Sequence, residues 1–277
     1  MNSRGHPLSR VAPDPFGPPM RLVLGLLALL VPLVPTAASA APGDAASRRA
    51  GPPYSVLQMN LCLSGAAGCF SGTEYPKIID EAVARIREND VTAVTLNEAC
   101  SGDVAEIAER TGYHFRFATV IYRGAPFQCR NPGGRGVFGN AVLTKDAVRT
   151  SEDAAFSAYN GVEERRWICV TTARAVDVCT SHLSTDGEAS DSTNTVQCGE
   201  LAALLAEREN PTVFAGDVNR RSSCAPDGFW TLTDAEATQL PGIQHAYGTL
   251  RNPTLELEST TYTDHDAMVV RGLVPVP

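Results

Sequence analysis

The strongest candidate for chemistry in this 277-residue sequence is a short apolar run that ends in two polar residues. Residues 213–216 are followed by Asp217, and Asn219 comes two positions later. Because side chains alternate along a strand, an extended backbone through this stretch points both polar side chains to the same side. A carboxylate and an amide held together can orient a water molecule or a phosphate. The alternative is an Asp-x-Asn turn that only begins the next segment.

Further polar residues lie where predicted buried strands end. Glu98 directly follows the apolar strand 91–97, and a carboxylate there is a hard oxygen ligand suited to magnesium or calcium. Asn60 lies near the end of strand 54–61, and His182 follows a strand that ends at residue 181. The alternative for Glu98 and His182 is an ordinary solvated residue at a strand end.

A carboxylate and a histidine stand side by side near the C-terminus. Asp264 and His265 precede the apolar stretch 267–270. The neighbouring carboxylate can orient the imidazole or raise its pKa, which suits a group that moves protons. A plain turn before the last strand explains the same pattern.

These residues need a scaffold of strands to bring them together, and the hydrophobic pattern predicts one. Besides the strand that ends at Asp217, strands are predicted over residues 54–61, 91–97, 113–121, 137–144, 167–172, 176–181, 243–249 and 267–271. Helices are predicted over residues 76–89, 103–110, 196–207 and, as a short one, 231–240. Strands alternating with helices and hairpins favour a layered sheet core covered by helices.

The first 40 residues have the features of a secretory signal. The apolar run 22–35 follows Arg21 and precedes Ala38-Ser39-Ala40, an A-x-A cleavage site, and it is too short to span a membrane. Met20 is an alternative start. We therefore expect a secreted, extracellular monomer without a membrane anchor, with a flexible lead-in over 41–53 and one domain over 54–277.

Eight cysteines follow the signal, and none forms a Cys-x-x-Cys pair. An even number in an exported chain favours four disulfides over a zinc site or a catalytic thiol. Their order along the chain suggests the pairs Cys62–Cys69, Cys100–Cys129, Cys169–Cys179 and Cys198–Cys224. The third pair has the best support, because the predicted hairpin of strands 167–172 and 176–181 places those two cysteines opposite each other.

The charge of the chain restricts the classes of partner. With 23 basic and 31 acidic residues, its formal net charge is −8 at pH 7. An acidic protein gains no long-range attraction to a polyanion, so its non-specific affinity for nucleic acid should be modest. This disfavours a DNA-binding module more than an enzyme, since catalysis needs only a local basic patch.

Taken in order, the polar positions resemble the motifs of the endonuclease/exonuclease/phosphatase superfamily, which includes pancreatic-type deoxyribonucleases, abasic-site endonucleases, sphingomyelinases and inositol-polyphosphate phosphatases. The resemblance covers the chain from Tyr54 onward. The matching segments are Gln58-Met59-Asn60-Leu61, Leu96-Asn97-Glu98, Gly139-Asn140-Ala141-Val142-Leu143-Thr144, Thr180-Ser181-His182-Leu183, Gly216-Asp217-Val218-Asn219 and Thr263-Asp264-His265-Asp266.

The resemblance implies an α/β (α+β) fold, a four-layer sandwich of two mainly antiparallel β-sheets flanked by helices, and metal-dependent hydrolysis of a phosphoester. It assigns the cation, Mg²⁺ or else Mn²⁺ or Ca²⁺, to Glu98 with help from Asn60. Asp217 would activate the attacking water while Asn219 binds phosphate. The cation would offset charge that develops on the phosphate oxygens, and an oriented water avoids a covalent intermediate.

The remaining roles also follow from the resemblance. His265 and His182 would stabilise the transition state or assist proton transfer, and Asn140 would contact the substrate. Asp264 is a further catalytic residue or metal ligand. One position departs from the family pattern: Gln244 stands where relatives carry an aspartate that supports the catalytic histidine, so the pKa of that histidine should be raised less unless Asp264 or Asp266 substitutes.

The substrate is the least determined feature of the sequence. Four arginines lie in loops expected near the strand ends, where they could bind flanking phosphates: Arg130, Arg135, Arg220 and Arg221. The alternative is that these arginines only contribute to solubility. We expect a phosphodiesterase acting on DNA or RNA. The alternatives are a phosphoesterase for sphingomyelin, inositol phosphates or other small esters, and a non-catalytic binding protein on the same scaffold, which the residue at 244 would favour.

Overall fold

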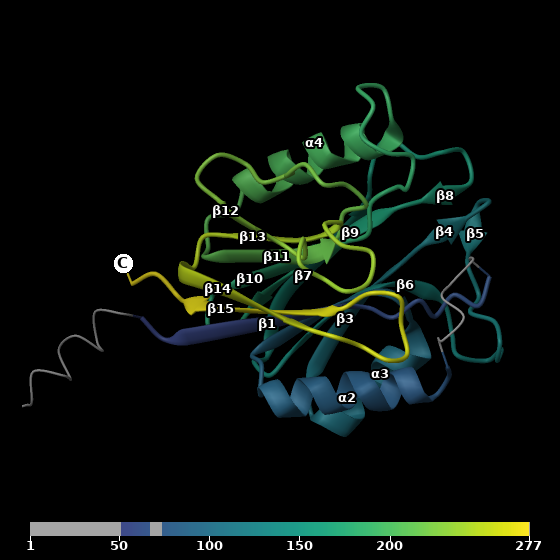
Figure 1. Cartoon of the computed structure of the whole chain (residues 1–277), viewed down its shortest axis with the longest axis horizontal. Helices are drawn as coiled ribbons and strands as arrows, with labels where there is room; N and C mark the ends of the chain where they lie inside the picture. Colours follow the sequence, from purple (N-terminus) through teal and green to yellow (C-terminus); the bar gives the residue numbers. More distant parts are fainter. Residues whose placement is uncertain (1–50, 67–73, 277) are drawn as a thin grey trace, which may run out of the picture. The chain divides into compact units, whose positions relative to one another are not determined.

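Two β-sheets packed face to face separate two layers of helices in the computed structural model (Figure 1). The structure describes residues 51–66 and 74–276, so the expected signal 1–40 and most of the lead-in lie outside it. One helical layer contains α2 (Lys77–Asn89) and α3 (Ser101–Thr111), and the other contains α4 (Thr193–Ala206). The predicted four-layer sandwich is therefore confirmed. No helix in the described part of the chain is long and apolar enough to cross a membrane.

The first sheet has the strand order β14-β15-β1-β2-β6-β3. Its strands are β1 (Pro53–Asn60), β2 (Ala93–Cys100), β3 (His114–Thr119), β6 (Phe138–Thr144), β14 (Arg251–Glu258) and β15 (Ala267–Leu273). β1 and β2 are parallel and are connected through α2, whereas the other neighbours are antiparallel.

The second sheet has the order β12-β13-β11-β10-β9-β7. Its strands are β7 (Val148–Ala155), β9 (Arg166–Thr172), β10 (Asp177–Ser181), β11 (Thr212–Asp217), β12 (Trp230–Thr233) and β13 (Gln244–Gly248). Here β10 and β11 are the parallel pair, and α4 connects them.

The two parallel pairs explain why polar residues gather at one edge of the sandwich. Each pair lies at the centre of its sheet, and parallel strands end at the same edge. Asn60 ends β1, Glu98 lies near the end of β2, Asp217 ends β11 and His182 follows β10. The topology thus brings four predicted site residues from distant parts of the chain to one place.

The apolar residues of these strands form the core that fixes this edge. Val56, Val142, Val178 and Val213 belong to the cluster between the sheets. The helices cover the outer faces, with Ile79 and Ile86 of α2 against β1 and β2 and with Leu201 and Leu205 of α4 against β11 and β13. Both faces of the central strands are therefore buried, and they appear in the sequence as continuous apolar runs.

One predicted helix was wrong, and several strands were not predicted. The expected helix 231–240 is instead β12 followed by turns, because residues 230–233 pair with β13. β7 and β14 were not predicted at all. Both are edge strands with mostly exposed or half-exposed side chains, so they lack the apolar pattern of a buried strand.

Three of the four suggested disulfides are present between described residues: Cys100–Cys129, Cys169–Cys179 and Cys198–Cys224. The hairpin argument for the second of these holds, since Cys169 and Cys179 are direct partners in the β9–β10 ladder. Cys62 is disulfide-bonded as well, and its suggested partner Cys69 lies outside the described residues.

A third, small sheet stands beside the sandwich. It has the order β5-β4-β8, formed by β4 (Ile121–Tyr122), β5 (Ala125–Pro126) and β8 (Glu163–Glu164). Figure 1 shows these strands together at the right of the view, beyond β6 and β9. Because Tyr122 pairs with Glu163 across the ladder, this sheet fixes the segment before β6 against the segment before β9.

Candidate active site

A cavity of about 640 Å³ opens where the polar residues converge. Six predicted site residues line it: Glu98, His182, Asp217, Asn219, Asp264 and His265. Asn60 contacts two of them from the end of β1. The cavity therefore brings together residues from distant parts of the chain.

The carboxylate of Asp217 is the centre of this arrangement. Asn60 Nδ2 donates to Asp217 Oδ2 at 3.0 Å, His265 Nε2 lies 3.4 Å from the same oxygen, and His182 Nε2 lies 3.6 Å from it. The other oxygen, Oδ1, accepts the backbone N–H of Asn219 at 3.0 Å. Burial raises the pKa of Asp217, which His265 and these hydrogen bonds oppose. A buried carboxylate with a raised pKa is a stronger base than a solvated one.

Asn97 fixes the position of Asp217 from the opposite sheet. Its Oδ1 accepts the backbone N–H of Asp217 at 2.8 Å, and its Nδ2 donates to Asn140 Oδ1 and Thr180 Oγ1. Asn97 is fully buried. This network joins β2 to β6, β10 and β11, so the two sheets cannot slide without breaking satisfied buried hydrogen bonds.

Glu98 reaches the cavity through an irregularity in its strand. The β2–β6 register shifts between Leu96 and Ala99, and Glu98 has a φ of +50°, a conformation that is uncommon outside glycine and is concentrated at functional sites. Asn60 Nδ2 donates to its Oε1 at 3.1 Å. Burial raises the pKa of Glu98 to about 7, although the positive charge of Arg165 and the Asn60 hydrogen bond oppose the shift.

The two histidines of the cavity are buried and face the carboxylates through Nε2. Burial, with help from the positive charge of Arg165, holds the pKa of His182 well below its usual range, so this imidazole is neutral at pH 7. His182 Nε2 also lies 3.9 Å from Glu98 Oε1. The Nδ1 of His265 is buried and has no hydrogen-bond partner among the described residues.

Gln244 does not bond to His265 in this structure. Its Nε2 donates to the Asp266 carbonyl at 2.8 Å and lies 3.3 Å from Asp234 Oδ2. The Asp266 carboxylate accepts hydrogen bonds from the backbone N–H and the hydroxyl of Thr238. Asp234, which was not predicted as a site residue, is fully buried against Gln244, and its segment was expected to be helical.

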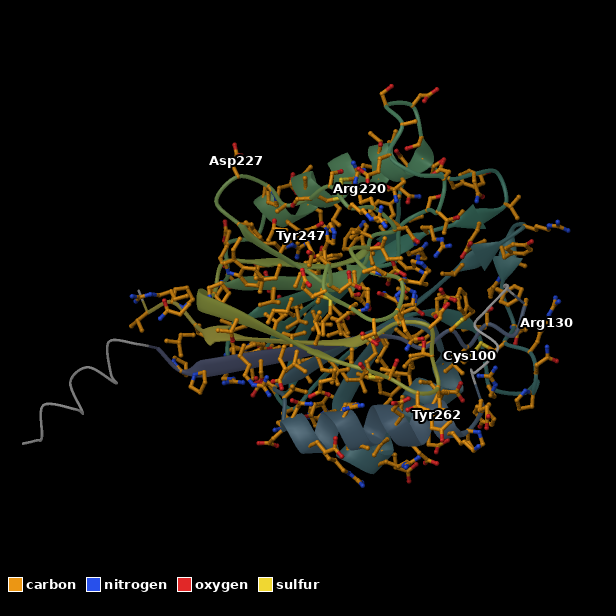
Figure 2. The ribbon with its side chains drawn as sticks, viewed as in Figure 1. Cys100, Arg130, Arg220, Asp227, Tyr247 and Tyr262 are labelled. Carbon is orange, nitrogen blue, oxygen red and sulfur yellow. A yellow bond between two sulfur atoms is a disulfide. The ribbon has the colours of Figure 1, made fainter. Side chains whose placement is uncertain are left out.

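Four residues predicted to bind substrate do not line the cavity: Asn140, Arg135, Arg220 and Arg221. Asn140 bonds to Asn97 and to the Arg166 carbonyl inside the sandwich. Arg135 is buried in an ion pair with Asp103, with Nη1 2.6 Å from Oδ2. Arg220 Nη1 donates to Asn194 Oδ1 in α4, and Figure 2 shows Arg220 close to that helix. Arg130 lies at the margin of the molecule in the same view. Of the four predicted arginines, only Arg130 lines the cavity.

Arg165 is a site residue that the sequence analysis missed. It directly follows β8, lines the cavity and is only 9% exposed. Its Nη2 lies 3.1 Å from Glu163, while its Nη1 is buried and has no hydrogen-bond partner among the described residues. The only signal for it is the run Glu163-Glu164-Arg165-Arg166, which has the composition of an exposed strand end. A buried guanidinium with an open donor beside carboxylates and imidazoles suits a phosphate oxygen.

Carboxylate oxygens are the candidate ligands for a divalent cation here. The described residues contain no group of three or more His, Cys, Asp and Glu side chains arranged to hold a metal ion. The electrostatics nevertheless fit a cation, because the charges of Asp217 and Asp264 both raise the pKa of Glu98. Asn60 presents nitrogen to these carboxylates, since its Oδ1 accepts the N–H of Cys62. Asn60 therefore orients Glu98, whose carboxylate has the hard oxygen atoms that such an ion prefers.

Comparison with known proteins agrees with this geometry. The family model described as "Endonuclease/Exonuclease/phosphatase family" matches residues 78–267. A comparison with curated proteins finds no match. Similar solved structures include truncated TDP2 of Caenorhabditis elegans, with a TM-score of 0.56, 15% identity and coverage of 80% of this chain and 98% of that one. The human nocturnin catalytic domain with bound sulfate has a TM-score of 0.58 and 13% identity, and the match covers 80% of this chain and 94% of that one.

A third solved structure is similar to the same extent. The endonuclease/exonuclease/phosphatase of Beutenbergia cavernae has a TM-score of 0.57 and 20% identity, and the match covers 80% of this chain and 72% of that one. At such identities the structural likeness demonstrates a shared fold and leaves the substrate open.

Proposed function

The chain belongs to the endonuclease/exonuclease/phosphatase family, and from that premise we propose that it is a secreted phosphodiesterase that hydrolyses nucleic acid with a divalent cation and direct attack of water. The family consists of phosphoester hydrolases. The observation that carries the proposal is the convergence of Asn60, His182 and His265 on one oxygen of Asp217, in a cavity that Glu98 also lines.

Asp217 is the general base of the proposed reaction. Its raised pKa allows it to take a proton from a water molecule held beside it, and the Asn219 and Asn60 hydrogen bonds keep the carboxylate in one orientation. Asn219 Nδ2 already donates to the Leu183 carbonyl at 2.9 Å, so one of its two amide hydrogens is left to contact phosphate. The proposed roles of Asp217 and Asn219 therefore use different atoms of the same turn.

Arg165 and the histidines would stabilise the charge that develops on the phosphate. The open Nη1 of Arg165 can donate to a non-bridging oxygen without losing another hydrogen bond. Because His182 is neutral, it donates a hydrogen bond without adding charge. His265, next to Asp264 at 3.8 Å, is the candidate to give a proton to the leaving oxygen.

Glu98 would hold the divalent cation, with Asn60 keeping its carboxylate in place. Bound there, a magnesium ion would neutralise charge on the phosphoryl oxygens. Burial raises the pKa of Glu98 to about 7, and the ionised form of this carboxylate would be favoured next to a bound cation. Mn²⁺ and Ca²⁺ are candidates for the same oxygen ligands.

Nucleic acid is the proposed substrate because basic side chains border an otherwise acidic site. Arg123, Arg130 and Arg165 all line the cavity, whereas the chain as a whole has a net charge of −8. A structural neighbour, TDP2 of D. rerio, has been solved with a single-strand DNA product. The three disulfides between described residues support an oxidising, extracellular location.

The substrate proposal is tested by one panel of hydrolysis assays on the purified mature protein. Plasmid DNA, single-stranded DNA, RNA, sphingomyelin vesicles and a generic aryl phosphodiester are compared, each with magnesium and with a chelator. We expect magnesium-dependent turnover of nucleic acid and of the generic ester. Turnover of sphingomyelin alone would assign the enzyme to lipid substrates, and the absence of turnover with every substrate would favour a binding protein.

A further inference from the structure

The cavity has an aromatic wall next to the catalytic residues. Val120, Tyr122, Phe127 and Phe138 line it on the side of the small sheet. The rings of Tyr122 and Phe127 meet edge to face, with centroids 5.5 Å apart, and Phe127 meets Phe138 in the same way at 5.9 Å. We call the rings of Tyr122, Phe127 and Phe138 the aromatic wall.

The wall is more than an edge of the hydrophobic core. Phe138 is buried, but Tyr122 and Phe127 are half-buried and line open space. Leu240, which is 49% exposed, lines the same cavity. An exposed leucine and two half-exposed aromatic rings facing one cavity form an apolar surface that a ligand would cover.

Two exposed arginines accompany the wall. The Arg123 guanidinium lies over the Tyr122 ring at 5.3 Å, and the Arg130 guanidinium lies over the Phe127 ring at 5.2 Å. Both arginines line the cavity. The surface therefore combines aromatic rings with positive charge, and this combination binds the bases and phosphates of single-stranded nucleic acid.

The small sheet connects the aromatic wall to Arg165, the residue proposed to bind the reacting phosphate. Tyr122 pairs with Glu163 in the β4–β8 ladder, and the N–H of Arg123 donates to the Val162 carbonyl at 2.7 Å. Arg165 follows β8 directly, with Glu163 as its ion-pair partner. The ring that would hold a base thus lies in this ladder, and the guanidinium that would hold the phosphate directly follows it.

We propose that the aromatic wall is a subsite for one unpaired nucleobase next to the scissile phosphate, so that the enzyme prefers single-stranded nucleic acid. This inference rests on the proposed function and specifies its substrate. In a duplex a base is stacked and paired, and bringing it against Tyr122 costs the energy of unstacking it. In a single strand the base is already free, and stacking tolerates any base because each has a π-face.

Equilibrium binding in EDTA tests the subsite without turnover. The probes are a labelled oligothymidylate of about eight nucleotides, which matches the shorter single-strand site sizes, a strand of equal length with abasic residues, and a duplex. We expect the base-bearing strand to bind wild-type protein roughly ten times more tightly than the abasic strand, the ratio that loss of one stacking platform produces. The duplex should bind more weakly than the single strand.

Substitutions locate this preference. Tyr122→Leu and Phe127→Leu place an apolar side chain at the position but remove the aromatic ring. Each should therefore bind the base-bearing and the abasic strand with nearly equal affinity. Tyr122→Trp keeps an aromatic ring and should keep the wild-type preference for the base-bearing strand. Tyr159→Leu is the matched control, because Tyr159 is 50% exposed and does not line the cavity. Thermal unfolding of each variant confirms that it is folded.

The outcomes separate this proposal from the proposed function. A wild-type protein that binds the base-bearing and abasic strands equally would overturn the subsite, even if it cleaves DNA with magnesium. A base preference that Tyr122→Leu abolishes would support the subsite, even if no substrate is hydrolysed. Competition by sphingomyelin vesicles, together with equal binding of the two strands, would make the wall a lipid subsite and refute the proposal.

Discussion

Replacement of Glu98 by glutamine should make the cation-free protein more stable at alkaline pH. Burial raises the pKa of Glu98 from 4.5 to about 7. A carboxyl whose pKa is raised in the folded state favours folding when it is protonated, so its contribution is fully present below pH 4.5 and is lost as the pH rises through 7. Glutamine has the shape of the protonated acid and does not titrate.

The size of the effect follows from the shift of the pKa. One pKa unit corresponds to about 1.4 kcal/mol, so a shift from 4.5 to about 7 amounts to about 3 kcal/mol once the carboxyl is fully ionised. Most of this change falls between pH 5 and pH 8. Glu98 is 15% exposed, so solvent screening of this group is limited. Relative to wild type, Glu98→Gln should therefore gain about 2–3 kcal/mol in unfolding free energy over that interval.

Urea unfolding in the presence of a chelator measures this gain at several pH values. Glu109→Gln is the matched control, since it makes the same change at an exposed position of α3. A difference between Glu98→Gln and wild type that stays constant from pH 5 to pH 8, or that falls, would refute the account of a buried and destabilised carboxylate. Added magnesium should stabilise wild type at pH 8 and leave Glu98→Gln unchanged, because a ligand stabilises only the protein that binds it.

Three further predictions concern other parts of the molecule. Asp103→Ala leaves the Arg135 charge buried without its partner, so it should cost about 3–5 kcal/mol of unfolding free energy; a loss below about 1 kcal/mol in urea would contradict this. Replacing Cys169 and Cys179 together by alanine opens a loop with a sequence separation of 10 and should cost about 2–3 kcal/mol, measured by the same method against wild type. Arg165→Met should lower kcat/KM for the generic phosphodiester about 10- to 100-fold, as loss of a charged hydrogen bond does, and an unchanged kcat/KM would exclude a phosphate contact.

The sequence predicts the site best where polarity interrupts an apolar strand. Glu98 and Asp217 follow buried runs, and the topology of two central parallel pairs brings them together. The three predicted disulfides that involve only described cysteines are also correct. Glu98 and Asp217 are predictable because buried strands leave a continuous apolar run in the sequence, and a polar residue that ends such a run is easily recognised.

Residues whose role depends on contacts across the fold were not predictable from local pattern. Asn140 lies in a strand that is buried throughout, so its amide satisfies Asn97 inside the sandwich. Arg135 stands in a glycine-rich loop of exposed appearance, yet it is buried against Asp103. Arg165 has charged neighbours on both sides, and only the pairing of β4 with β8 directs it into the cavity.

The most direct test of the account is the rate at which Asp217→Asn hydrolyses a generic phosphodiester with magnesium. The substitution preserves shape and removes the base to which Asn60, His182 and His265 are directed. Asp227→Asn, in an exposed loop at the margin of the molecule in Figure 2, is the matched control. We expect kcat to fall by about 100-fold or more in Asp217→Asn and to stay at the wild-type value in Asp227→Asn. Wild-type turnover by Asp217→Asn would contradict the central role of Asp217.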